Sequence, residues 1–279
     1  MSLEVLKELQ GELEAGRSAV LVSIISFRGS VPRKDHPRAL FLKDGRQSGT
    51  VGGGCLDGQA RSLAGELFER GGSLRRSHTL DVENAQEAGL HCGGSVELEG
   101  RRFDDLPEDR ALLEELLADP ELVPPRLFVF GGGHVGLASA RLAHGVGFAV
   151  SVIDDRVAFA NSERFPFAEA CVSGPPEAAD ELPTLGARDA IFIMTRAHQQ
   201  DLGVLEWACG TGAGHIGLLG STRKRDSLLR LLVEHGYSLE SLEGRFHSPV
   251  GVEIGAATPE EIGLAAVAEL VNFRRGASA

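Results

Sequence analysis

The sequence predicts an α/β protein: a C-terminal Rossmann-like domain with a parallel sheet follows a smaller N-terminal α+β domain. From residue 126 onward, apolar strands alternate with helical segments, which is typical of a parallel sheet with crossover helices. A glycine-rich loop leads into the first of these helices, and a charged segment ending in Pro124-Pro125 precedes them. We therefore expect an N-terminal domain at 1–100, a linker at 101–125 and a C-terminal domain at 126–279.

The N-terminal domain reads as a helix, a strand, a hairpin, a second helix and two more strands. The first helix carries leucines on one side, and the hairpin has an Asp-Gly turn between two β-rich runs. The second helix ends at a pair of glycines, a common stop signal. We expect these elements at Ser2–Ala15, Ala19–Phe27, Ala39–Leu42, Gln47–Val51, Gly54–Arg70, Ser73–Leu80 and Ser95–Glu99.

The C-terminal domain alternates strand and helix, after a short helix around Glu108–Leu117 in the linker. Its last helix has the clearest start, because Thr258-Pro259-Glu260-Glu261 combines an N-cap, a first-turn proline and a capping-box glutamate. That apolar helix either packs back on the domain or forms a homodimer interface. We expect the other elements at Leu127–Phe130, His134–His144, Ala149–Ile153, Ala170–Val172, Ala190–Met194 and His215–Leu219.

The composition of the chain indicates which kinds of partner and cellular location to expect. The formal net charge is -12, so the mean field repels nucleic acids and anionic membranes. The N-terminal residues are acidic and amphipathic, unlike a secretory signal, and no apolar run is long enough to span a bilayer. The four cysteines are far apart, without disulfide or zinc-ribbon spacing. We expect a cytoplasmic protein.

The loop Gly131-Gly132-Gly133-His134-Val135-Gly136 follows an apolar strand and fits the pattern G-x-G-x-x-G. Gly131, Gly133 and Gly136 would permit a tight turn, a close approach of pyrophosphate and close helix packing. His134 is a candidate phosphate contact, proton donor or simple helix cap. Asp154 ends the next strand and is a candidate for a ribose hydroxyl.

Whether a dinucleotide binds stays open at this point. Arg156, close to Asp154, would equally suit a 2′-phosphate, and a Rossmann-like scaffold without a nucleotide is the alternative. The only tyrosine, Tyr237, is followed four residues later by Ser241, which excludes a Tyr-x-x-x-Lys catalytic pair. Weaker candidates follow the strand that ends at Met194, at the edge where open α/β sheets bind ligands: Arg196, His198 and Asp201.

A second anion site is expected where a strand leads into a helix at Ser221, a candidate N-cap. Arg223, Lys224 and Arg225 lie in the first helical turn, although the positive end of the helix dipole disfavours cations there by roughly 0.3–1 kcal/mol each. A bound phosphate would explain this arrangement. The alternative is a solvated basic turn that Asp226 partly offsets.

Two motifs of the N-terminal domain are further candidates. Arg33 lies in a strongly basic loop, and arginine suits oxoanion recognition. Cys55 follows three glycines, Gly52, Gly53 and Gly54, at the start of a helix, where a thiolate would be stabilised. Cys92 also lies between glycines. Each cysteine alone is more typical of a small buried residue, but two such cysteines in one domain indicate soft-metal or sulfur chemistry.

Taken together, the motifs resemble the xanthine dehydrogenase accessory protein family, of the XdhC and CoxI type, over nearly the whole chain. One departure is Asp57, where the family usually has glutamate. The resemblance rests on the blocks Gly29–Arg33, Gly49–Leu56, Cys92–Gly94, Gly131–Gly136, Gly217–Arg225, Pro249–Gly251 and Thr258–Ile262.

The resemblance implies a molybdenum-cofactor chaperone rather than an enzyme. Such a protein binds the molybdopterin cofactor, assists its sulfuration by a cysteine desulfurase, and delivers it to a xanthine dehydrogenase-like molybdenum hydroxylase. It would place Cys55 and Cys92 as thiolate ligands near molybdenum, and the two anion sites around the cofactor phosphate. An NAD(P)-dependent oxidoreductase and a protein-docking scaffold are the alternative functions.

Overall fold

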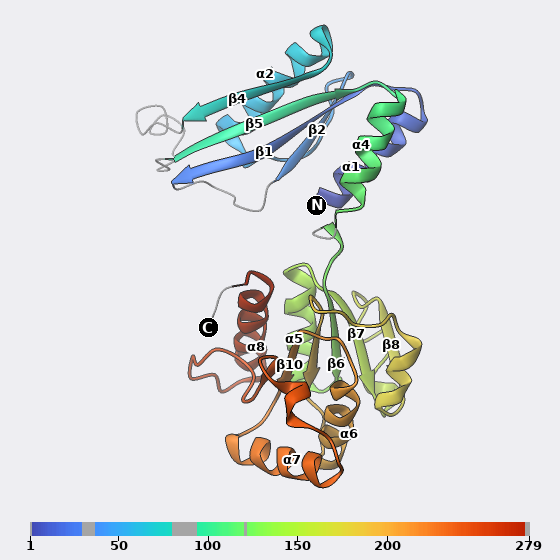
Figure 1. Cartoon of the computed structure of the whole chain (residues 1–279), viewed down its shortest axis with the longest axis vertical. Coiled ribbons are helices and arrows are strands. Elements are labelled where there is room, and N and C mark those ends of the chain that lie inside the picture. Colours follow the sequence, from blue (N-terminus) through green and yellow to red (C-terminus); the bar gives the residue numbers. More distant parts are fainter. Residues whose placement is uncertain (1, 30–36, 80–93, 120–121, 277–279) are drawn as a thin grey trace. The chain divides into compact units, whose positions relative to one another are not determined.

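The computed structural model divides the chain into two compact units, residues 1–123 and 124–279 (Figure 1). It describes residues 2–29, 37–79, 94–119 and 122–276. The first unit contains an antiparallel sheet and the second a parallel sheet flanked by helices, so the predicted fold class is confirmed. No helix in these described ranges has the length and apolar character needed to cross a membrane.

Unit 1 is built on a five-stranded antiparallel sheet in the order β3-β2-β1-β5-β4. Its central strand β1 has buried side chains on both faces, because helices cover both. Val22 packs toward Leu63 of α2, whereas Leu21 packs in a second cluster with Leu9 of α1 and Leu113 of α4. The elements are α1 (Ser2–Glu14), β1 (Ala19–Gly29), β2 (Arg38–Leu42), β3 (Gln47–Gly49), α2 (Gly54–Arg70), β4 (Ser73–Thr79), β5 (Gly94–Phe103) and α4 (Pro107–Leu117).

The segment 101–125, expected as a linker, contributes to unit 1. Strand β5 continues to Phe103, which is buried, and α4 packs against α1. Asp109 in α4 is only 4% exposed, and its carboxylate accepts hydrogen bonds from Arg101 and from the backbone of Asp104. The charged residues that made this segment look like a connector therefore pair with each other.

Unit 2 is a six-stranded, wholly parallel sheet in the order β11-β10-β9-β6-β7-β8. This is the doubly wound order of a Rossmann fold, with the change of direction between β6 and β9. The two-residue strand β11 was not expected from the sequence. The elements are β6 (Arg126–Phe130), α5 (His134–Gly145), β7 (Ala149–Asp154), β8 (Ala170–Ser173), β9 (Ala190–Ile193), α6 (His198–Cys209), β10 (His215–Leu218), α7 (Thr222–Glu234), β11 (Phe246–His247) and α8 (Pro259–Arg274).

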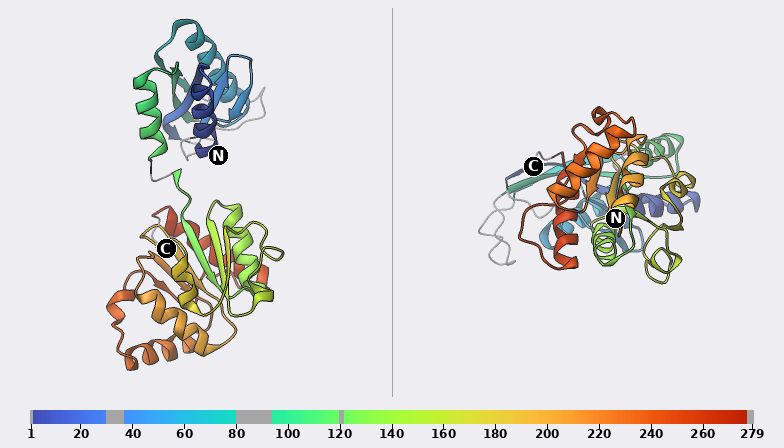
Figure 2. Two further views of the ribbon diagram at one scale, coloured as in Figure 1. Left: turned by 90° about the vertical axis from the view of Figure 1, so that its right-hand side faces the viewer. Right: turned by 90° about the horizontal axis from the view of Figure 1, so that it is seen from below.

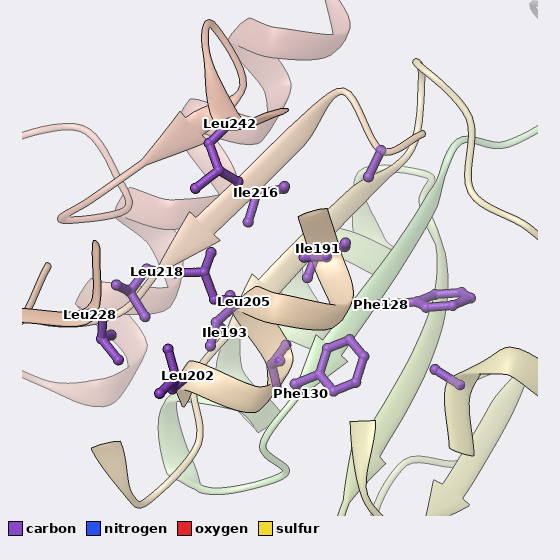
Figure 3. Close-up of a cluster of buried hydrophobic side chains, with 14 of the residues drawn as sticks. Phe128, Phe130, Ile191, Ile193, Leu202, Leu205, Ile216, Leu218, Leu228 and Leu242 are labelled. Atoms are coloured by element: carbon purple, nitrogen blue, oxygen red, sulfur yellow. The ribbon is translucent and has the colours of Figure 1, made fainter. Parts of the chain in front are cut away.

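Helices cover both faces of this sheet (Figure 2). On one face, Phe130 and Ile193 pack with Leu205 of α6 and Leu228 of α7 (Figure 3). On the other face, alternate strand residues meet α5 and α8, and Leu270 of α8 is fully buried. The last helix therefore packs back on unit 2, with the predicted capping box at its start.

Two of the crossovers lack the α-helix that the alternating pattern predicted. Residues between β7 and β8 contain only a 3-10 helix at Val157–Phe159, and those between β8 and β9 one at Pro176–Glu181. Pro166 lies inside the first of these segments and Pro183 follows the 3-10 helix of the second, and a proline in either place disfavours a continuous helix because it removes a backbone donor. The resulting irregular segments lie at the edge of the sheet where ligands of this fold class bind.

Candidate functional site

The strands β6, β7, β9 and β10 all end at one edge of the sheet of unit 2. Hydrogen bonds align the residues that follow them, since Gly131 donates to Ile153 and Met194 donates to Phe130. The strand order reverses between β6 and β9 at this edge. In open α/β sheets, ligands bind in the crevice at such a switch point.

Close packing against neighbouring backbone atoms explains most of the glycines in the loop at this edge. A Cβ on Gly131, which has φ of 108°, would lie 2.3 Å from the carbonyl oxygen of Met194, and one on Gly136 would lie 1.9 Å from that of Gly131. A Cβ on Gly132 would similarly meet the carbonyl of Phe159 at 1.8 Å. Only Gly133 of this loop has open space around that position. The loop therefore offers a ligand the backbone near Gly133.

Gly133 is also the N-cap of α5, and no side chain in the described part of the chain caps this helix. The first backbone N–H groups of α5 are left to solvent or to a ligand, at the positive end of the helix dipole. His134, the first residue of the helix, is exposed. An anion would find free donors at this point.

Asp154, at the end of β7, is buried, and both of its carboxylate oxygens accept hydrogen bonds from within the protein. The amide of Gly132 donates to its Oδ2 at 2.9 Å, and Arg156 donates to both carboxylate oxygens at 2.8 and 3.0 Å. Burial alone would raise the pKa of Asp154, but the hydrogen bonds from Arg156 and Gly132 outweigh it and hold that pKa below its ordinary value. The acceptors that a ribose hydroxyl would need are already occupied within the protein.

The segment after β7 folds over the glycine loop and holds Asp154 in place. The guanidinium of Arg156 lies 3.6 Å from the ring centroid of Phe159, and Arg164 donates to the carbonyl of Gly132 at 2.9 Å. Since Phe159 also approaches Gly132, this segment closes that side of the loop. Arg156, which would suit a 2′-phosphate, is committed to Asp154.

A pocket of about 350 Å³ opens at the same edge, on the face of the sheet covered by α6. Its polar side chains come from the ends of β7 and β9 and from α6. Arg196 and Gln200 both donate to Oδ2 of Asp155, each at 2.8 Å, so the pocket contains a hydrogen-bonded carboxylate. The lining residues are Phe130, Gly131, Ile153, Asp154, Asp155, Gly174, Pro175, Pro176, Thr195, Arg196, Gln200 and Val204.

This pocket includes only part of the predicted site. Gly131, Asp154 and the weaker candidate Arg196 line it, whereas Gly133 and His134 do not. Gln200 and Thr195 were missed by sequence reasoning, although they follow a strand end in the same way as Arg196. Position after a parallel strand is the signal that could have found them.

In the basic turn that begins at Ser221, some of the polar groups have partners inside the protein. Ser221 is the N-cap of α7, as predicted, and its Oγ accepts from the amide of Lys224 at 3.3 Å. The ammonium of Lys224 lies 2.5 Å from the carboxylate of Asp201 and donates to the carbonyl of Leu219 at 2.8 Å. Asp201 is completely buried and needs this counter-charge.

The other two cations of the turn differ from each other. Arg225 donates to the carbonyl of Ser248 at 3.2 Å and pairs with Asp226. Arg223 is exposed at the surface of unit 2. The cost of three cations at a helix start is therefore offset largely by internal partners, which leaves Arg223 as the cation of this turn best able to reach an anion.

In unit 1, the glycines before Cys55 form a turn that only glycine adopts easily. Gly52, Gly53 and Gly54 have φ of 143°, 81° and 52°, and the amides of the first two donate to Oγ1 of Thr50. That hydroxyl donates in turn to the carboxylate of Asp57 at 2.8 Å. Cys55 follows in the first turn of α2.

The thiol of Cys55 is exposed, whereas Cys171 and Cys209 are partly buried. Among the cysteines that the structure describes, Cys55 is therefore the one most accessible to a ligand. Arg33 and Cys92 lie outside the described residues, so the predicted roles of Arg33 in oxoanion binding and of Cys92 as a thiolate ligand stay predictions.

Comparisons with known proteins agree with these features. The XdhC Rossmann domain matches residues 127–270, and the XdhC and CoxI family matches residues 12–79. A Bacillus subtilis protein, named as a probable subunit of xanthine dehydrogenase, is 26% identical, over 96% of this chain and 96% of its own length. The molybdenum cofactor insertion chaperone PaoD of Escherichia coli is 24% identical, over 94% of this chain and 85% of its own.

Two further proteins are similar. YqeB of Escherichia coli is 30% identical over 92% of this chain, which spans 44% of that protein. A crystal structure from Bacillus halodurans, described as a xanthine dehydrogenase, superposes with a TM-score of 0.77 and 21% identity, over 99% of this chain and 96% of the other. At this identity, the structural match supports the fold alone.

Proposed function

This chain belongs to the XdhC family, and from that premise we propose that it binds a molybdenum cofactor and delivers it to a molybdenum hydroxylase. The observation that carries the proposal is its alignment with PaoD, a protein named for molybdenum cofactor insertion, over 94% of this chain. The partners we propose are a xanthine dehydrogenase-type enzyme as acceptor and a cysteine desulfurase as sulfur donor. Binding and transfer, rather than turnover, are then the activity.

The pocket beside Gly131 suits the pterin part of such a cofactor. Its volume of about 350 Å³ is in the range of small-molecule sites, and Phe130, Ile153 and Val204 provide apolar walls. A pterin ring presents N–H donors, from which a carboxylate oxygen accepts a charge-assisted hydrogen bond. Asp155 lines the pocket and is held in position by Arg196 and Gln200.

The cofactor also carries a phosphate, for which unit 2 offers free donors. The uncapped start of α5 at Gly133 presents backbone N–H groups, with His134 exposed beside them. Since β9 alone separates β6 from β10, the end of β10, which leads into α7, lies about 10 Å from the end of β6 by strand spacing. We assign the phosphate to the start of α5 and give Arg223 a secondary electrostatic role.

Unit 1, taken by itself, offers a thiol. Molybdenum favours soft sulfur ligands, and we propose the exposed Cys55 as a thiol able to bind it. The Thr50–Asp57 hydrogen bonds fix the turn that precedes this thiol. Cys171 provides a matched control, because burial raises the pKa of its thiol and so disfavours the thiolate.

The proposal is tested by measuring the pterin that co-purifies with the full chain, through fluorescence after oxidation. Protein from cells that make molybdopterin should carry pterin, and protein from cells unable to make it should not. Asp155→Asn should lower pterin retention at least about tenfold, since a hydrogen bond to a charged group is worth roughly 1.5–3 kcal/mol. Glu206→Gln, on α6 but paired with His235, is the control.

Each possible result of these measurements tests a different part of the proposal: cofactor binding, the pocket, or the thiolate. Absence of pterin from the wild-type protein would refute cofactor binding. Pterin retained in full by Asp155→Asn would refute this pocket only. Cys55→Ala should lower molybdenum per bound pterin, while Cys171→Ala should not, and an equal ratio in both would remove the thiolate role. Binding of nicotinamide dinucleotides has less support, because Asp154 and Arg156 already satisfy each other.

A further inference from the structure

A second group of polar side chains lies away from the pocket, on the face of the sheet covered by α5 and α8. His215 lies in β10, His247 in β11 and Glu269 in α8. One ligand atom from each of these residues lies within 4.8 Å of the other two. Residues far apart in the sequence therefore converge on one point.

His215 is completely buried, yet neither ring nitrogen has a hydrogen-bond partner among the residues that the structure describes. Oε1 of Glu269 is buried and unpartnered too. A buried polar atom without a hydrogen-bond partner destabilises the folded state, so a bound ligand that supplies a partner would be stabilising.

The carboxylate of Glu269 is oriented toward the two rings. The amide of Gly251 donates to Oε2 at 2.8 Å, which fixes the group and leaves Oε1 facing the imidazoles. Oε1 lies 3.4 Å from Nε2 of His215 and 3.4 Å from Nδ1 of His247. These separations are long for hydrogen bonds.

The separations of Oε1 from the two ring nitrogens match those between ligands of one metal ion. The rings of His215 and His247 stack at 4.3 Å and 22°, so the partly exposed ring of His247 has to turn for both rings to bind one ion. Bonds of 2.0–2.1 Å at tetrahedral angles place two ligand atoms about 3.3–3.4 Å apart. Two imidazoles and a carboxylate are a donor set that zinc takes with a fourth position left for water. His247, with its side chain 36% exposed, provides an opening to solvent for entry of an ion.

We propose that His215, His247 and Glu269 form a binding site for a divalent transition-metal ion, with zinc as the ion that this donor set fits best. The ion would satisfy the unpartnered atoms of His215 and Glu269. It would also join β10, β11 and α8, and so stabilise the packing of the last helix on the sheet. Phe192 and Phe273 enclose the ring of His215 and would keep that side of the ion dry.

The test is zinc binding to the full chain without an affinity tag, stripped with chelator and titrated with zinc chloride by calorimetry. We expect one ion per chain and a rise in Tm on zinc addition. His247→Ala and Glu269→Gln should each weaken the affinity at least about tenfold and abolish the Tm rise. His235→Ala is the matched control, because this histidine pairs with Glu206 alone at the surface.

Absence of zinc binding by the wild-type chain, or unchanged affinity in both variants, would overturn the proposal. Since a variant that fails to fold would also lose zinc, Co²⁺ bound to the wild-type protein supplies an independent readout. Tetrahedral coordination gives Co²⁺ an intense visible absorption, which we expect; the weak spectrum of an octahedral ion would contradict the site. Neither readout requires a molybdenum cofactor.

Discussion

Each unit contains a glycine-rich turn that leads into a helix, but the glycines are present for different reasons. In unit 1, Gly52–Gly54 have positive φ, and a Cβ on Gly53 would meet nothing within 4 Å. In unit 2, Gly131 and Gly136 are required by backbone atoms that would lie 2.3 and 1.9 Å from an added Cβ. In unit 1 the glycines are needed for the backbone conformation of the turn. In unit 2 they are needed because backbone atoms pack closely against them.

The two turns therefore offer different groups to a ligand. The turn of unit 1 itself presents a reactive group, the exposed thiol of Cys55. The loop of unit 2 presents mainly backbone, and the polar side chains beside it come from neighbouring strand ends, as with Asp155 and Arg196. Glycine spacing alone does not separate these two cases.

The largest effect is expected from Gly136→Val. A Cβ at this position would lie 1.9 Å from the carbonyl oxygen of Gly131, and Gly131 is itself held by the hydrogen bond from its amide to Ile153. We expect the free energy of unfolding of unit 2 to fall by about 3 kcal/mol or more. Urea denaturation measures it, and wild-type stability of the variant would contradict a packed loop.

Asp154→Asn should have the next largest effect, with a clear dependence on pH. The folded protein holds the pKa of this carboxyl below its ordinary value of 3.8, so the stabilisation is present above pH 3.8 and is lost as pH falls through the folded-state pKa. Near pH 7 we expect the variant to be less stable by about 2 kcal/mol.

The measurement is denaturant unfolding of wild type and Asp154→Asn as a function of pH. The two stability curves should converge as pH falls from the ordinary pKa of the carboxyl through its lower folded-state pKa, because the protonated aspartic acid and asparagine are then both uncharged. A constant difference down to acid pH would show that the charge of Asp154 contributes nothing.

A smaller effect is expected from Thr50→Val in unit 1. This isosteric change removes the hydroxyl that accepts from Gly52 and Gly53 and donates to Asp57. Because water can replace these bonds, we expect a loss of about 1 kcal/mol. Alkylation of Cys55, followed by peptide mass spectrometry, should change in rate, and an unchanged rate would mean that the turn does not position the thiol.

The smallest effect on stability is expected from Gly133→Ala, in the same loop as Gly136. This glycine has negative φ and open space around the position of a Cβ, so the free energy of unfolding should change by less than about 0.5 kcal/mol. A large loss, measured by the same urea method, would show that all glycines of the loop are packed.

Much of the fold was predictable because its signals are local. The helix α2 begins and ends at the predicted residues, and the capping box at Thr258 marks the start of α8. The irregular crossover after β7 and the two-residue strand β11 were not predicted, because an irregular path and a short edge strand have no periodic pattern.

The candidate site was harder to predict, since it depends on contacts between distant residues. Lys224 looked free to bind an anion, but the buried carboxylate of Asp201 takes its charge. The group of His215, His247 and Glu269 has no spacing that a sequence motif would recognise. Its members are brought together only by the pairing of β10 with β11 and the packing of α8.

The central claim, that the protein binds the cofactor and delivers it, is tested most directly by transfer. Protein loaded with molybdenum cofactor is freed of unbound cofactor and mixed with a molybdenum hydroxylase apoenzyme, and the molybdenum on each protein is measured after separation. We expect the metal and pterin to move together to the hydroxylase and to activate it, with less transfer from Asp155→Asn. Cofactor that stays on the loaded protein, or activation no better than by free cofactor, would contradict the account.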